Sequence, residues 1–170
     1  AAAVGSTIAP AVASASAPAA APAEVPASWP RELDKEIAAA QGSSAPGAKL
    51  YRDGLGAMKD GKYPLAVVKF AKLQHTYPKS ELAEPAAYFS ANALYETGKY
   101  DESVLQFNDL VMRYPKGPFT SAALLRQAQA FLKLNDRIDA RLTLQKLKSD
   151  HSGTQEAAAA DSMLKSLVND

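Results

Sequence analysis

The chain has 170 residues, of which 47% are hydrophobic, and a formal net charge of +1 at pH 7. This length suits one domain plus a tail. A net charge so close to zero provides no general attraction to nucleic acid or to an anionic membrane, so we expect neither as a partner. The sequence has no cysteine, which excludes disulfides, thiolate metal sites and a lipid-anchoring cysteine within it. It contains no apolar run of about 18 residues, so no membrane span is expected.

Residues 1–47 are expected to be a largely disordered tail or linker. Residues 1–28 are rich in alanine, proline and serine and lack the large apolar side chains that offset the entropy of ordering. A short helix is expected at about 30–40, because proline suits a first helical position and Leu33 and Ile37 would share one face. We expect Trp29 to belong to a solvated linker. The flexible stretch 42–47 marks the domain boundary.

A period of 37 residues organises the rest of the chain. Gly61-Lys62-Tyr63 recurs as Gly98-Lys99-Tyr100, and Tyr77-Pro78-Lys79 recurs as Tyr114-Pro115-Lys116. A fixed period of this length predicts stacked supersecondary units. The third copy is weaker and carries Asn135 in place of the glycine.

Each unit has the apolar spacing of two helices. Leu50, Gly54, Ala57 and Met58 recur at three- and four-residue steps, which indicates an apolar helical stripe. Glycine ends the first helix of a unit, and a Tyr-Pro pair ends the second. We therefore predict an all-α solenoid over 48–168. Its three helix-turn-helix units span about 48–79, 80–116 and 117–153, and a C-terminal capping helix follows over 154–168.

The second helix of the first two units carries a recognisable motif, which drifts to Ala140 and Leu144 in the third unit. Alanine or serine is followed four residues later by phenylalanine and then by a proline, as in Ala66, Phe70 and Pro78. Small residues such as Gly54 would let the paired helices approach closely while Phe70 fills the space between them. This pattern resembles tetratricopeptide repeats.

The unit is about three residues longer than the usual tetratricopeptide repeat. With Gly-x-Tyr between its helices and Tyr-Pro-x-Ser at its exit, it resembles the C-terminal repeat domain of the Tol-Pal-associated YbgF family, also called the cell division coordinator CpoB. The resemblance implies a periplasmic adaptor that binds TolA and coordinates a peptidoglycan synthase with outer-membrane constriction during cell division. Residues 1–47 lack sustained heptads, so the trimerising coiled coil of that family is not expected here.

Two other classes of protein stay open. Outer-membrane assembly proteins of the BamD type share the Tyr-Pro-x-Ser exit, so the chain is alternatively a structural subunit or spacer of another envelope assembly. Buried convex or end-on surfaces would favour a spacer, and an occupied groove would favour an adaptor. A hydrolase would need paired carboxylates in the groove, where we expect only Glu96.

No residues form a persuasive catalytic, cofactor-binding or metal-binding constellation. His75 and His151 lack metal-ligand spacing and are interpreted as surface or repeat-contact residues. Acidic residues at helix starts, such as Asp101 and Glu102, suit the helix dipole. Gly54-Leu55-Gly56 lies within a predicted helix without a preceding strand, so it is not a phosphate loop. We expect a protein that is not an enzyme and has no cofactor.

The predicted functional surface is a concave groove lined by the first helix of each unit. Tyrosines there suit partner binding, because they present a large area with a polar tip. The groove positions expected in register are Tyr51, Leu55, Met58, Lys59, Tyr88, Asn92, Tyr95, Glu96, Leu125, Gln129, Leu132 and Lys133. The bland alternative is that several of these side chains pack between helices.

Overall fold

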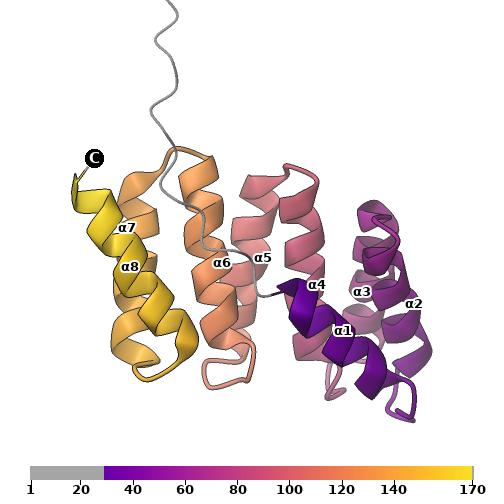
Figure 1. The fold of residues 1–170 in the computed structure, drawn as a ribbon. Helices are drawn as coiled ribbons and strands as arrows, with labels where there is room; N and C mark the ends of the chain where they lie inside the picture. The colour runs from indigo at the N-terminus through magenta and orange to yellow at the C-terminus, as the bar shows by residue number, and fades with distance from the viewer. Residues whose placement is uncertain (1–28, 170) are drawn as a thin grey trace, which may run out of the picture.

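The computed structural model describes residues 29–169, which form eight α-helices and no strand (Figure 1). The tract at 1–28 that we expected to be disordered lies outside the described residues. In chain order the helices are α1 (Trp29–Ala40), α2 (Ala48–Lys59), α3 (Tyr63–Thr76), α4 (Ala83–Glu96), α5 (Tyr100–Arg113), α6 (Thr120–Lys133), α7 (Arg137–Asp150) and α8 (Gln155–Asn169). The predicted fold class, an all-α repeat solenoid, is confirmed.

The helices stack as three antiparallel pairs followed by a cap. Each of α2, α4 and α6 packs against the helix that follows it, and α8 packs on both α6 and α7. The first helices also contact one another, α2 with α4 and α4 with α6, and form one face of the stack. This inner row, together with α8, is called the concave face below. The other face, formed by α3, α5 and α7, is called the convex face.

The turns within the three pairs have the same geometry. Gly61, Gly98 and Asn135 have φ values of 70°, 77° and 60°. In each turn the next residue donates its N–H to a carbonyl five residues earlier, as in Lys62 to Ala57 at 2.8 Å and Asp136 to Phe131 at 2.9 Å. Asparagine tolerates the left-handed region better than other non-glycine residues, so the third unit keeps the turn without the Gly-Lys-Tyr motif.

Gly54 lets α2 and α3 pack closely, as the sequence indicates. A Cβ atom at position 54 would lie 2.5 Å from a ring carbon of Phe70. The fully buried Phe70 ring also lies 6.0 Å from that of Tyr51 and 6.4 Å from that of Phe89. This aromatic core continues to Phe119. In the third unit the core is aliphatic instead, with Leu124, Leu144 and Leu147 packed against Ala160 of α8.

The convex face carries one exposed aliphatic side chain at the same position of every unit. Val68, Leu105 and Leu142 lie 37 residues apart and are 62%, 68% and 56% exposed. Buried positions on the same helices, such as Phe107, face the paired helix. The convex face therefore carries a repeated row of exposed apolar side chains, and Leu65, Met112 and Ile138 on the same helices are exposed as well.

We expected Trp29 to belong to a solvated linker, and this expectation was wrong. Trp29 is the first residue of the packed helix α1. The helix packs on α2 at the concave face, and Trp29, Leu33 and Ala40 are 8%, 5% and 3% exposed (Figure 1). These three residues join the same hydrophobic cluster as Tyr51. The expectation failed because these side chains find apolar partners that are distant in sequence.

Candidate functional site

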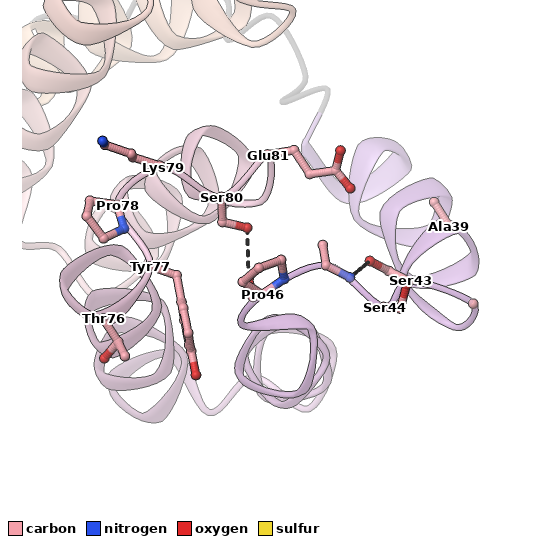
Figure 2. A pocket seen from close by; sticks show the side chains of 12 residues that line it. Ala39, Ser43, Ser44, Pro46, Thr76, Tyr77, Pro78, Lys79, Ser80 and Glu81 are labelled. Atoms are coloured by element: carbon pink, nitrogen blue, oxygen red, sulfur yellow. Dashed lines mark hydrogen bonds between the residues drawn. The ribbon is translucent and has the colours of Figure 1, made fainter.

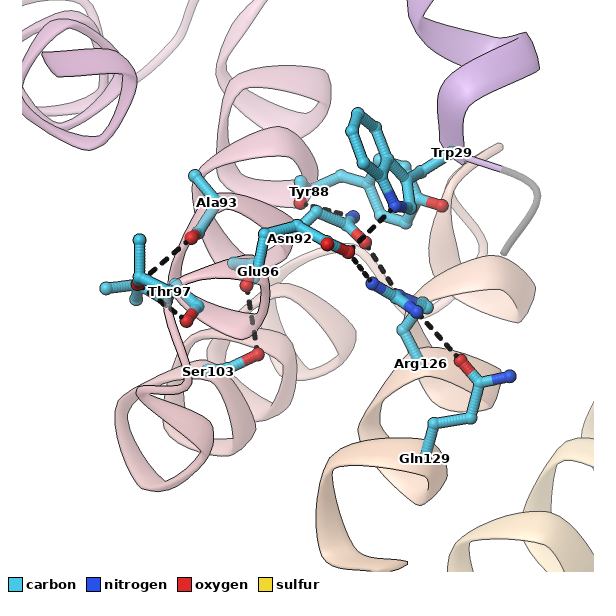
Figure 3. Close-up of polar contacts among 11 residues, drawn as sticks. Trp29, Tyr88, Asn92, Ala93, Glu96, Thr97, Ser103, Arg126 and Gln129 are labelled. Atoms are coloured by element: carbon cyan, nitrogen blue, oxygen red, sulfur yellow. Dashed lines mark hydrogen bonds and ion pairs between the residues drawn. The ribbon is translucent and has the colours of Figure 1, made fainter. Parts of the chain in front are cut away.

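A buried polar network occupies the centre of the concave face, between α4 and α6 (Figure 3). Arg126 of α6 is its hub and is 5% exposed. Its guanidinium donates to Asn92 Oδ1 at 2.8 Å, to Glu96 Oε1 at 2.7 Å and to Gln129 Oε1 at 3.1 Å. We call these four residues the Arg126 network.

The network contains the positive charge of the buried Arg126 guanidinium, and burial of this charge is energetically unfavourable. Removing a guanidinium from water is unfavourable unless a carboxylate and hydrogen bonds replace the lost hydration. Glu96 supplies the carboxylate, and its side chain is 28% exposed, so the pair lies at the edge of the buried region. The guanidinium carbon also lies 3.8 Å from the centre of the Tyr95 ring, a cation–π arrangement. The contacts of Arg126 thus join α4 and α6.

The amide of Asn92 extends the network into the backbone. Its Nδ2 donates to the Tyr88 carbonyl oxygen at 2.9 Å, while its Oδ1 accepts from Arg126. Both polar ends of this fully buried side chain are therefore satisfied. This arrangement fixes the orientation of Asn92 and, through it, the direction of the guanidinium.

The helix α1 completes the concave face at its N-terminal end. Trp29 Nε1 donates to Glu96 Oε1 at 3.1 Å, and the Tyr51 hydroxyl donates to Glu36 Oε2 at 2.7 Å. Burial, reinforced by the adjacent Glu36 carboxylate, raises the pKa of Tyr51. Arg52 donates to the Ala40 carbonyl oxygen at the end of the helix, at 3.1 Å. The N-terminal half of the groove is therefore filled by the chain itself.

The structure brings the predicted groove residues onto the inner helices but buries most of them. They are buried because each first helix packs against its own partner helix and its neighbours, and α1 covers part of α2 and α4. Buried are Tyr51, Leu55, Met58, Tyr88, Asn92, Leu125 and Gln129; half-buried are Tyr95 and Leu132; at the surface are Lys59, Glu96 and Lys133. That they bind a partner stays a prediction.

Sequence reasoning missed Arg126, the hub of the network. One signal was available, since the residue 37 positions earlier is the buried Phe89. A charged residue at a core position of a repeat indicates that its unit meets a different environment. The equivalent position one unit further back is Arg52, which donates to the Ala40 carbonyl oxygen at the end of α1.

The connection between α1 and α2 borders an open surface hollow (Figure 2). Residues 42–46 form one wall of this hollow, and the exit of the first unit, 76–81, forms the other. Ser80 Oγ donates to the Pro46 carbonyl oxygen at 2.8 Å and so fastens the end of the connection to that exit. This bond positions the start of α2 but leaves residues 41–45 as the link to α1.

Within 29–169, no group of three or more His, Cys, Asp and Glu side chains is arranged to hold a metal ion. His75 and His151 lie at the ends of α3 and α7, on separate repeats. None of the helices in this part of the chain is both long and apolar enough to cross a membrane.

The stacked helix pairs and their repeated turns define a tetratricopeptide-type repeat domain, a class of domain that binds protein partners. A tetratricopeptide repeat model matches residues 122–154, which cover most of α6 and all of α7. The model of the YfiO family, described as an outer membrane lipoprotein, matches residues 43–118, which cover α2 to α5. No curated protein matches the chain.

Proposed function

We propose that this chain is a non-enzymatic protein-interaction adaptor of the bacterial cell envelope, located in the periplasm. The observation that carries the proposal is the similarity of residues 43–118 to an outer membrane lipoprotein family, in a solenoid with a preorganised polar network on its concave face. Ordered side chains on rigid helices lose little entropy when a partner binds. The concave surface around Glu96 and Lys133 is the proposed contact region.

Within the envelope, we propose a role in the Tol-Pal system, with TolA and a peptidoglycan synthase as partners during cell division. The Gly-Lys-Tyr and Tyr-Pro-Lys motifs and their 37-residue spacing support this role through the resemblance to the YbgF family. The near-neutral net charge favours a protein partner over nucleic acid.

A matched pair of charge reversals tests the adaptor. Purified TolA and the peptidoglycan synthase are each captured on immobilised wild-type chain, on Lys133→Glu and on Lys72→Glu. Lys133 is exposed at the end of concave α6, and Lys72 is exposed on convex α3, so both changes alter charge without disturbing a core. We expect Lys133→Glu to weaken capture by about tenfold and Lys72→Glu to leave it unchanged. A wild-type chain that captures neither partner would rule out the Tol-Pal role.

The second candidate is a structural subunit of an outer-membrane assembly machine of the BamD type. The match to the outer membrane lipoprotein family and the exposed apolar row Val68, Leu105 and Leu142 favour it, because such a row suits burial against another subunit. Co-purification with outer-membrane assembly proteins that is lost in Leu105→Glu, with TolA capture unaffected, would identify this role.

A further inference from the structure

The helix α1 is held on the concave face by only a few of its side chains. Three of its twelve residues are buried, whereas α4 buries eleven of fourteen. One carboxylate oxygen of Glu32 is buried and has no hydrogen-bond partner among the described residues. Such an oxygen loses its hydration without replacement, which weakens the docking of α1. A helix of this length is also marginal once it is detached.

The surface beneath α1 is formed without it. Two hydrogen bonds of the Arg126 network run from α6 to α4 and the third lies within α6, and α1 adds the single bond from Trp29 to Glu96. The Tyr51 ring packs against the Phe70 ring of α3, so its position is also supported by the repeat itself. We call the surface made by Tyr51, Arg52 and Glu96, the side chains that hydrogen-bond α1, the α1 seat. Because its parts are already ordered, another helix could replace α1 at little cost in reorganisation.

The contacts of α1 define the chemistry that the seat accepts. Trp29 donates an N–H to Glu96, Leu33 is buried one turn later, and Glu36 accepts from the Tyr51 hydroxyl one turn further on. These residues stand at i, i+4 and i+7, the spacing of anchors on one face of a helix in a groove. The pattern therefore reads as an aromatic donor, an aliphatic anchor and a carboxylate.

We propose that the α1 seat binds an amphipathic helix of a partner protein with this pattern, and that α1 occupies the seat until such a helix displaces it. This inference rests on the proposed adaptor function and names the kind of segment that the adaptor takes. The short link at 41–45 keeps α1 at an effective concentration of about 1 mM beside its seat. If α1 fills the seat about 90% of the time, it weakens the apparent affinity of a competing helix about tenfold.

The test uses the full chain and a fluorescently labelled synthetic peptide with the sequence of Trp29–Ala40. Leu33→Asp removes the buried anchor of α1, and Ala38→Asp adds the same charge on its exposed face as the control. Trp29 is the sole tryptophan of the chain, so its emission and its quenching by acrylamide report whether α1 is docked.

We expect Leu33→Asp to expose Trp29 and to bind the peptide about tenfold more tightly than the wild type and Ala38→Asp do. A peptide in which phenylalanine replaces the tryptophan should bind Leu33→Asp about tenfold more weakly than the parent peptide, because it lacks the N–H donor to Glu96. That comparison changes only the peptide, so it does not depend on the folding of a further variant.

Equal peptide affinity for the wild type and Leu33→Asp would overturn the proposal, as would equal affinity of the two peptides. A wild-type dimer that Leu33→Asp converts to a monomer would also overturn it, since α1 would then lie on a second copy. Failure to capture TolA alongside the expected peptide results would reject the Tol-Pal role and leave the seat standing. Capture of TolA without peptide binding would reject the α1 seat and leave the Tol-Pal role standing.

Discussion

At the scale of single residues, two glycines of α2 allow the effect of packing on stability to be distinguished from the effect of helix propensity. A Cβ atom at Gly54 would overlap the Phe70 ring, whereas one at Gly56 would meet nothing within 4 Å. We predict that Gly54→Ala lowers the free energy of unfolding by about 1–3 kcal/mol, because overpacking outweighs the gain in propensity. Gly56→Ala should raise it by up to about 1 kcal/mol. Urea unfolding followed by far-UV circular dichroism measures both, and equal effects would contradict the packing account.

Residues also show where sequence reasoning succeeds and where it stops. The left-handed turns at Gly61 and Asn135 and the filling role of Phe70 could be predicted, because each depends on local conformation or on the repeat. The placement of Arg126 could not be predicted in the same way. Its burial depends on Glu96, Asn92 and Gln129 together. No local sequence pattern indicates that these three side chains accept hydrogen bonds from one guanidinium.

At the scale of elements, Glu84 connects α4 to the turn before α6. Its carboxylate accepts the Phe119 N–H at 3.0 Å, and burial raises the pKa of Glu84 above its ordinary value despite this bond. A group that binds its proton more tightly when folded stabilises the fold below its unfolded pKa, and this contribution is lost as the pH rises through the folded value.

We therefore predict that Glu84→Gln loses less stability than the wild type as the pH rises above the ordinary pKa value of 4.5. The exposed neighbour Glu81 provides the control, since Glu81→Gln should keep the wild-type slope. Urea titrations at each pH give the slopes. Parallel curves for Glu84→Gln and the wild type would contradict this role of Glu84.

Asp161 of α8 has the opposite pH dependence. Lys148 of α7 and Lys165 of α8 hydrogen-bond its carboxylate and lower its pKa to about 2. A lowered pKa stabilises the fold above the unfolded value of 3.8, and this contribution is lost as the pH falls towards 2. Asp161→Asn should therefore reduce stability at neutral pH and flatten the acid side of the thermal unfolding curve. Asp60→Asn, whose partner Lys62 lies in the same turn, should leave the acid side unchanged.

Docking of α1 is the element-scale feature that the sequence did not indicate. A short helix was expected at about 30–40, with its apolar residues on one face. The sequence pattern predicts this face but does not indicate which surface it packs against. The bond between Trp29 and Glu96 spans 67 positions. Such a contact is set by the stacking of the repeats, which places the end of α4 beside the start of α1.

At the scale of the whole molecule, a stack of repeats can lose one end while the other remains folded. Ala160 is fully buried between α8 and the last repeat, so Ala160→Asp places a charge in the terminal core. We predict a cost of about 3 kcal/mol or more there, and faster amide hydrogen exchange in α6 and α7 than in α2 and α3. Ala158→Asp, on the exposed side of α8, is the control. Uniform acceleration along the chain would indicate one cooperative unit instead.

The three turns that end at Lys62, Lys99 and Asp136 make the same hydrogen bond at 37-residue steps. A segment that runs from one of these turns to the next therefore begins and ends at interchangeable junctions. Copying it into the gene would add a helix pair whose two boundaries already exist elsewhere in the chain. The length of the concave face is consequently a property that gene duplication can change without inventing a new kind of contact.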